Sequence, residues 1–293
     1  MDDVRRLADA VLYEGYLLWP YRRSALKNQR RWTFGGVHPP AHHREHPDDR
    51  SVMRAECLLV GGEAAAVDVT VRFLHLVVRD DDGWEEATER ELASGRLDAR
   101  TLLAGVQMPV RVAAGAAEGR RWERLDGTID VSARRLAPDL LRVAVVVANT
   151  TPFAGDGRQE ALRVSFCSAH AVLTARGGRF ASLTDPPEAL RDAAAACVND
   201  GVWPVLVGPP GSHTTMLASP IILEDHPRIA PESPGDLFDG GEIDQLLTLS
   251  ILALTDDEKA EMRAADPRAR AILERTEALS RQQLLALHAE MRR

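Results

Sequence analysis

The run that decides the fold is Val67-Asp68-Val69-Thr70-Val71-Arg72-Phe73. Its apolar residues occupy every second position, and polar residues stand between them. Successive side chains of a β-strand point to opposite faces, so a period of two predicts a strand with one face in a core and the other toward solvent. Further runs of this kind lie between about Met53 and Ala181, among them residues 129–132, 140–148 and 162–166.

Short segments that contain Gly, Pro or Asp join these runs, for example residues 80–83 and 136–139. Strands on such short connections pair antiparallel, because parallel neighbours need a crossover of a dozen or more residues. We predict an α+β protein whose core is an antiparallel β-sandwich or curled sheet. One helix, around Trp84 to Ala93, is expected between the strands.

Helical patterns are expected at both ends of the chain. Residues 2–13 carry one apolar stripe, and in the C-terminal region Thr255 with Glu258 forms a capping box, while Asp266 precedes a proline at the first helical position. The predicted organisation is an N-terminal helix and arm (1–52), a β-rich domain with a proline-rich arm at 204–236 (53–240), and a C-terminal helical region (241–293).

The composition excludes several classes of protein. The chain has 293 residues and a formal net charge of −8, which disfavours nucleic-acid binding by the whole molecule. The first ten residues are too charged for a secretory signal, so we expect a cytoplasmic protein. The longest strongly apolar run, Leu140–Ala148, is far short of the ~20 residues of a membrane helix, so no membrane insertion is expected. The three cysteines form no C-x-x-C pair, and we expect them to be reduced.

Four histidines, at positions 38, 42, 43 and 46, lie within nine residues. Imidazole is a common ligand of zinc, nickel and copper, and neighbouring carboxylates can complete a coordination shell. One interpretation is therefore a nickel or zinc site with ligands from this cluster: His42, His43 and His46, with Glu45, Asp48 and Asp49 nearby. The other is an irregular loop without metal, because prolines at 39, 40 and 47 disfavour a regular helix.

Charge is segregated along the chain. From Gly15 to Arg44 there are basic residues interleaved with aromatic ones and no acidic residue, whereas Glu224 to Glu258 holds ten acids against a single arginine. Such segments could pack on each other through Arg–carboxylate pairs, bind a protein partner, or, for the basic one, stack on nucleotides. We expect no nucleic-acid partner. The predicted partner-binding residues are Tyr16, Trp19, Tyr21, Arg22, Arg23, Lys27, Trp32, Asp225, Glu232 and Asp236.

Two stretches carry a family resemblance: LYEGYLLWPYRRSALKNQ at residues 12–29, and PIIL at 220–223 followed by HPRIAPESPGDLFD at 226–239. They resemble an uncharacterised bacterial protein family that is encoded alongside high-affinity nickel-iron hydrogenases. The resemblance implies an accessory role in maturation, assembly or metal delivery, with a hydrogenase subunit or maturation factor as partner. It implies no catalytic residues.

The expected function is therefore that of a non-catalytic accessory protein, whose basic and acidic segments form one composite protein-binding surface. The chain lacks a phosphate-binding loop with its lysine, a nucleophile elbow and a zinc-protease helix. A metal-binding or metal-trafficking protein that uses the His38–His46 cluster is the alternative. An enzyme whose site assembles from distant residues is a third possibility.

Overall fold

The computed structural model describes residues 2–14, 21, 34–228 and 244–280. Contacts within the chain form two units, residues 1–12 with 34–227 and residues 13–33 with 228–293. The first unit contains every strand of the described ranges, and the second contains the C-terminal helices. The domain boundaries expected at residues 52 and 240 stay a prediction.

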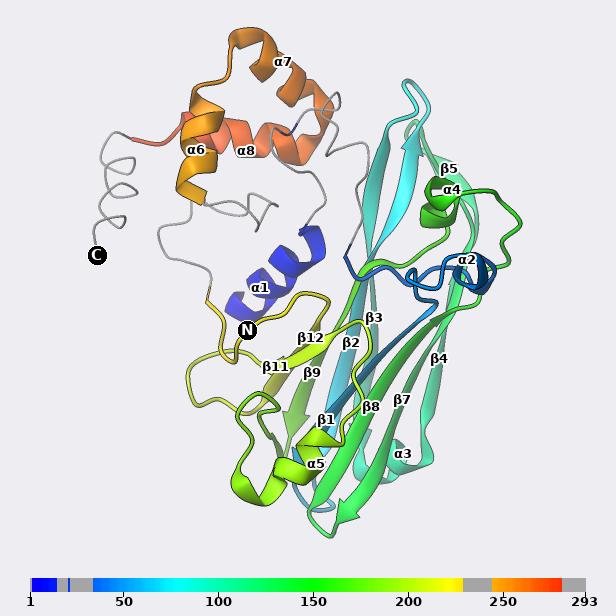
Figure 1. The fold of residues 1–293 in the computed structure, drawn as a ribbon, viewed down its shortest axis with the longest axis vertical. Helices are drawn as coiled ribbons and strands as arrows, with labels where there is room; N and C mark the ends of the chain where they lie inside the picture. The colour runs from blue at the N-terminus through cyan, green and yellow to red at the C-terminus, as the bar shows by residue number, and fades with distance from the viewer. Residues whose placement is uncertain (1, 15–20, 22–33, 229–243, 281–293) are drawn as a thin grey trace. The chain divides into compact units, whose positions relative to one another are not determined.

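Two antiparallel sheets build the first unit (Figure 1), so the predicted α+β class is confirmed. One sheet has the strand order β10-β1-β8-β7-β4. Its strands are β1 (Val52–Val60), β4 (Val106–Val112), β7 (Leu125–Ala137), β8 (Leu140–Asn149) and β10 (Arg179–Phe180).

The other sheet has the order β11-β12-β9-β2-β6-β5. Strand β3 also belongs to this sheet and pairs with β2 outside this order. Its strands are β2 (Ala66–Arg79), β3 (Glu85–Asp98), β5 (Gly115–Ala117), β6 (Arg120–Trp122), β9 (Cys167–Arg176), β11 (Trp203–Leu206) and β12 (Thr215–Ser219). Three short helices interrupt the strands: α3 (Ala99–Ala104), α4 (Arg158–Arg163) and α5 (Arg191–Ala195), which follows the 3-10 turn Glu188–Leu190.

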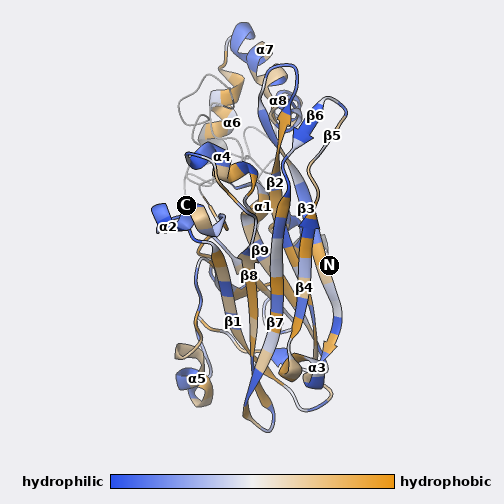
Figure 2. Ribbon diagram, turned by 90° about the vertical axis from the view of Figure 1, so that its right-hand side faces the viewer, coloured by the Kyte–Doolittle hydropathy of each residue, from blue (hydrophilic) through white to orange (hydrophobic). Residues whose placement is uncertain are grey.

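The core lies between the two sheets. The predicted alternation on β2 is confirmed, because Val67, Val69, Val71 and Phe73 are all fully buried in one cluster with residues from β1, β7 and β8. Figure 2 shows polar and apolar bands that follow one another along the strands. Burial of this apolar surface contributes roughly 25 cal/mol per Å² to stability.

The N-terminal helix α1 (Asp2–Tyr13) belongs to the first unit up to residue 12. This part of the helix lies on the outer face of the sheet that contains β11 and β12. Leu7 and Val11 pack in a separate apolar cluster with residues of β11 and β12. Asp9 binds Arg72 of β2 at 2.6 Å. The apolar stripe predicted for residues 2–13 therefore has a partner.

The helix expected around Trp84–Ala93 is wrong, because these residues belong to strand β3. The segment is rich in helix-forming Glu, Ala and Arg, but β3 pairs with β2 from Glu85 to Asp98. Intrinsic propensity is a weak preference that ladder hydrogen bonds and burial override. Gly95, at φ 65°, gives β3 the backbone freedom for the irregularity in this register.

The strand expected at residues 162–166 is wrong as well. Helix α4 ends at Arg163, and β9 begins only at Cys167. Five residues are too few to separate a period of two from one turn of helix, because the buried Leu162 and Phe166 are also four positions apart. The Ser165 hydroxyl donates to the Ala161 carbonyl at 2.6 Å, a second hydrogen bond to an oxygen that also accepts from the Val164 amide at the end of α4.

In the second unit the described helices are α6 (Asp244–Leu252), α7 (Asp256–Ala265) and α8 (Pro267–Glu277). Both predicted helix starts are confirmed. Thr255 and Glu258 form the reciprocal capping box of α7, and the Asp266 carboxylate accepts from the Arg268 amide at the start of α8. In this unit Arg268 also lies over the ring of Tyr13, 3.8 Å from its centroid.

All three cysteines are free thiols, as predicted; Cys57 and Cys167 are buried and Cys197 is partly buried. None of the helices in the described ranges has both the length and the apolar character that spanning a lipid bilayer demands.

Candidate metal centre

The histidine cluster lies on a short helix, α2 (Pro40–Glu45), and on the residues that flank it. The expectation that prolines exclude regular helix here is wrong. Pro40 stands in the first turn of the helix, where the backbone N–H groups have no intrahelical acceptor and the N–H that proline lacks is not needed. The helix ends at Glu45, before Pro47. The short helix turns His42 inward, with a side chain that is almost completely buried.

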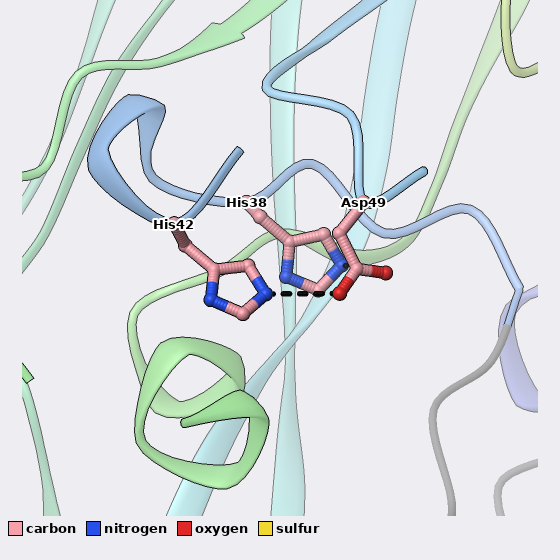
Figure 3. A group of neighbouring side chains, drawn as sticks. All are labelled: His38, His42 and Asp49. Carbon is pink, nitrogen blue, oxygen red and sulfur yellow. Dashed lines mark hydrogen bonds and ion pairs between the residues drawn. The ribbon is translucent and has the colours of Figure 1, made fainter. Parts of the chain in front are cut away.

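Two histidines and one carboxylate converge there (Figure 3). The Nε2 atom of His42 lies 2.9 Å from Oδ2 of Asp49, and Nε2 of His38 lies 3.6 Å from Oδ1 of the same carboxylate. One ligand atom from each of the three residues falls within 4.8 Å of the other two. His38 and His42 are buried, and the Asp49 side chain is 28% exposed, so protein encloses the two imidazoles while the carboxylate stays partly in contact with solvent.

A hydrogen bond from outside the cluster fixes the tautomer of His38. The single hydroxyl proton of Ser165 is used on the Ala161 carbonyl, so Ser165 Oγ must accept from Nδ1 of His38, which lies 3.1 Å away. Nε2 of a neutral His38 then carries the lone pair. That lone pair faces the cluster, as in metal-ligating histidines whose other nitrogen donates to a supporting group.

Electrostatics keep His38 neutral and Asp49 ionised near pH 7. Burial lowers the pKa of His38 to about 4, and the nearby positive charges of Arg158 and Arg50 act in the same direction. Burial alone would raise the pKa of Asp49, but the hydrogen bond with His42 and the charges around it hold that pKa below its usual range. A lone pair and a carboxylate therefore face each other across 3.6 Å, a repulsive arrangement that a cation between them would stabilise.

The separations fit a first-row transition-metal ion. Ligands at about 2.0–2.1 Å in a tetrahedral site lie about 3.4 Å from one another. The two nitrogen–oxygen distances of 2.9 and 3.6 Å bracket that value, and the three ligand atoms all lie within 4.8 Å of one another, so the group has the dimensions of a three-ligand site. Two histidines and one carboxylate leave at least one further coordination position open.

The structure separates the three histidines predicted as ligands. Only His42 belongs to the cluster. Nδ1 of His43 contacts the backbone carbonyl of Asp49 at 3.1 Å, and the exposed His46 ring packs against His42 with 4.5 Å between centroids. The second histidine of the group is His38, which was not among the predicted ligands.

Most of the predicted partner-binding residues lie outside the described residues: Tyr16, Trp19, Arg22, Arg23, Lys27, Trp32, Glu232 and Asp236. Tyr21 is described and fully buried, with φ 57°. The Asp225 carboxylate accepts hydrogen bonds from the hydroxyls of Ser182 and Thr184 and from the Leu206 amide. The composite surface therefore stays a prediction.

Two residues that shape the cluster have no signal in the sequence. Ser165 follows α4 and orients His38 across 127 positions of chain. Gly36 lies so close to the imidazole that a Cβ atom on it would come within 2.5 Å of His38 Nε2. No local motif marks either residue, because their importance comes from contacts that only the folded chain makes.

No protein-family model matches the chain, and no curated protein matches it in sequence. The family expected from residues 12–29 and 220–239 therefore stays a prediction.

Proposed function

We propose that this protein binds one divalent first-row transition-metal ion through His38, His42 and Asp49. The observation that carries the proposal is the convergence of Nε2 of two buried histidines, His38 and His42, on the Asp49 carboxylate, at 3.6 and 2.9 Å. The His42–Asp49 hydrogen bond by itself would serve only to close the loop after α2. That role does not involve Nε2 of His38, the third polar atom of the group, whereas a bound cation would engage all three residues.

Nickel and zinc are the ions that we expect, since imidazole nitrogen and carboxylate oxygen suit both. Nickel would connect the site with the predicted accessory role beside a nickel-iron hydrogenase in the cytoplasm. That association, with a hydrogenase subunit or maturation factor as partner, is itself a proposal and rests on the resemblance of the two segments. Tight retention of nickel in preference to zinc would support it.

The test is metal retention by protein purified without a histidine tag. Apoprotein is incubated with Ni²⁺ or Zn²⁺, desalted and measured by mass spectrometry of the metal. We expect about one equivalent in the wild type and a loss of at least tenfold in affinity in Asp49→Asn, because removal of the carboxylate charge leaves two neutral ligands.

Asp48→Asn is the matched control, because Asp48 is an exposed neighbour outside the cluster. It should retain the metal like the wild type. Retention of less than a tenth of an equivalent by the wild type, or equal retention in Asp49→Asn and Asp48→Asn, would overturn the proposal.

A further inference from the structure

Three arginines meet on the outer face of the first sheet, away from the histidine cluster. Arg54 of β1, Arg142 of β8 and Arg134 of β7 line a cavity of about 320 Å³. The other lining residues are Glu56, Ser132, Ala133, Ala144 and Val198. Glu56 is the single acidic member of this lining, so its formal net charge is +2.

Strand register creates the hollow. Ala144 of β8 pairs with Glu56 on one side and with Ser132 on the other, so two small side chains form the floor. One step along the same face, Arg142 pairs directly with Arg134. In the other direction Arg54 pairs with Val146. Directly paired residues share a face of the sheet, so the arginines stand at both ends of a low floor.

Glu56 is already engaged by the protein itself. Its Oε1 accepts from Nε of Arg54 at 3.1 Å and from Nη2 of the same guanidinium, and its Oε2 accepts from the Val198 amide at 2.8 Å. This carboxylate is buried, and Arg142 reaches it only at 4.0 Å. Glu56 therefore neutralises Arg54 and pairs only at long range with Arg142, while the described residues offer Arg134 no carboxylate.

Those two arginines repel each other. Like charges on directly opposite residues of a sheet are destabilising, and among the described residues no carboxylate lies within 4 Å of the Arg134 guanidinium. An anion between the two guanidinium groups would relieve the repulsion, because guanidinium forks match the geometry of phosphate and carboxylate groups.

We propose that this cavity, the Arg54–Arg134–Arg142 pocket, binds a small molecule through a phosphate or carboxylate group. Its volume is at the small end of the range for ligand pockets, which suits a metabolite rather than a chain segment. The proposal is independent of the metal centre, since none of the lining residues belongs to the histidine cluster.

Isothermal titration calorimetry with inorganic phosphate and, separately, with malonate tests the proposal at constant ionic strength. We expect saturable binding of one equivalent of at least one of the two anions, and the anion that binds identifies the group. Arg134→Gln should weaken binding at least tenfold. Arg142→Lys, which keeps the charge but loses the planar guanidinium fork, should also weaken it.

Arg111→Gln is the matched control. Arg111 of β4 is exposed and pairs with Asp126 of β7, so it stands on the same outer face as Arg134 but does not line the cavity. The affinity of the Arg111→Gln variant for the anion should stay within twofold of the wild-type affinity. Absence of binding to both anions, wild-type binding by Arg134→Gln, or an equal loss in Arg111→Gln would overturn the proposal. Circular dichroism would verify that each variant is folded.

Discussion

The side-chain amide of Asn149 donates a hydrogen bond to the carbonyl oxygen of Val37, 2.9 Å away. The same Nδ2 donates to the Val164 carbonyl at 2.8 Å, and Oδ1 accepts from the Thr151 amide at 2.8 Å. Val37 precedes His38, and Val164 precedes the serine that orients it. The end of β8 therefore holds both chain segments that place the His38 imidazole.

Asn149→Asp should be strongly destabilising. The substitution keeps the shape but points a carboxylate oxygen at two carbonyl oxygens in a site with 2% exposure, so two donated bonds become repulsive contacts. We expect a loss of about 3 kcal/mol or more in the free energy of unfolding, measured by urea denaturation.

Asn199→Asp provides the comparison. Within the described part of the chain Asn199 uses its Oδ1, which accepts from the Glu56 amide at 2.7 Å, and an aspartate supplies the same acceptor. This variant should lose less than about 1 kcal/mol. Similar losses in the free energy of unfolding of both variants would show that the two hydrogen bonds donated by Asn149 do not contribute to stability.

Gly36→Ala should weaken metal binding. A Cβ at this position would lie 2.5 Å from Nε2 of His38, closer than real contacts allow, so the imidazole has to move. Since Nε2 is the proposed ligand atom, we expect a loss in Ni²⁺ or Zn²⁺ affinity of roughly 10–100-fold, as for other changes that misplace a ligating histidine. Competition with a chelator of known affinity measures the change.

The control is Gly62→Ala, because a Cβ on Gly62 meets nothing within 4 Å. Its affinity for the metal should equal that of the wild type. If Gly36→Ala binds as tightly as Gly62→Ala does, the ligand set does not include His38.

The parts of the fold that were predictable from sequence are those that local chemistry decides. Alternation on β2 and the caps of α7 and α8 depend on residues within one strand or one helical turn. Strand β3 was not predictable, because its composition favours a helix and only its pairing with β2 makes it a strand. Whether a half-exposed segment pairs in this way is decided by the rest of the chain.

The candidate site divides in the same manner. The spacing of the histidines pointed to this segment, and His42 proved to be part of the cluster. Selection of His38 over His43 and His46 depends on Ser165 and Asn149, which lie more than a hundred positions away. The Arg54–Arg134–Arg142 pocket arises from strand register alone, which no pattern of single residues specifies.

Buried histidines should make the protein sensitive to acid. His75 and His170 are both fully buried, and burial lowers the pKa of each to about 4, assisted by Arg90 and Arg72 respectively. In the unfolded chain a histidine titrates near pH 6.5. Between about pH 6.5 and 4 the unfolded chain therefore takes up protons that the folded chain refuses, so the free energy of unfolding falls as the pH falls.

The variant His170→Asn isolates one of these contributions. Nδ1 of His170 contacts the Ser168 carbonyl at 3.0 Å, and the asparagine Nδ2, which takes the position of Nδ1, can donate there without titrating. Wild-type stability should drop between about pH 7 and pH 4.5 by roughly 2–3 kcal/mol more than that of the variant. Above pH 7 the difference between the two proteins should be independent of pH, because the imidazole is then neutral in both states. The free energy of unfolding of both proteins is measured by urea denaturation at each pH. If the two plots against pH stay parallel down to pH 4.5, His170 is protonated in the folded protein as easily as in the unfolded chain.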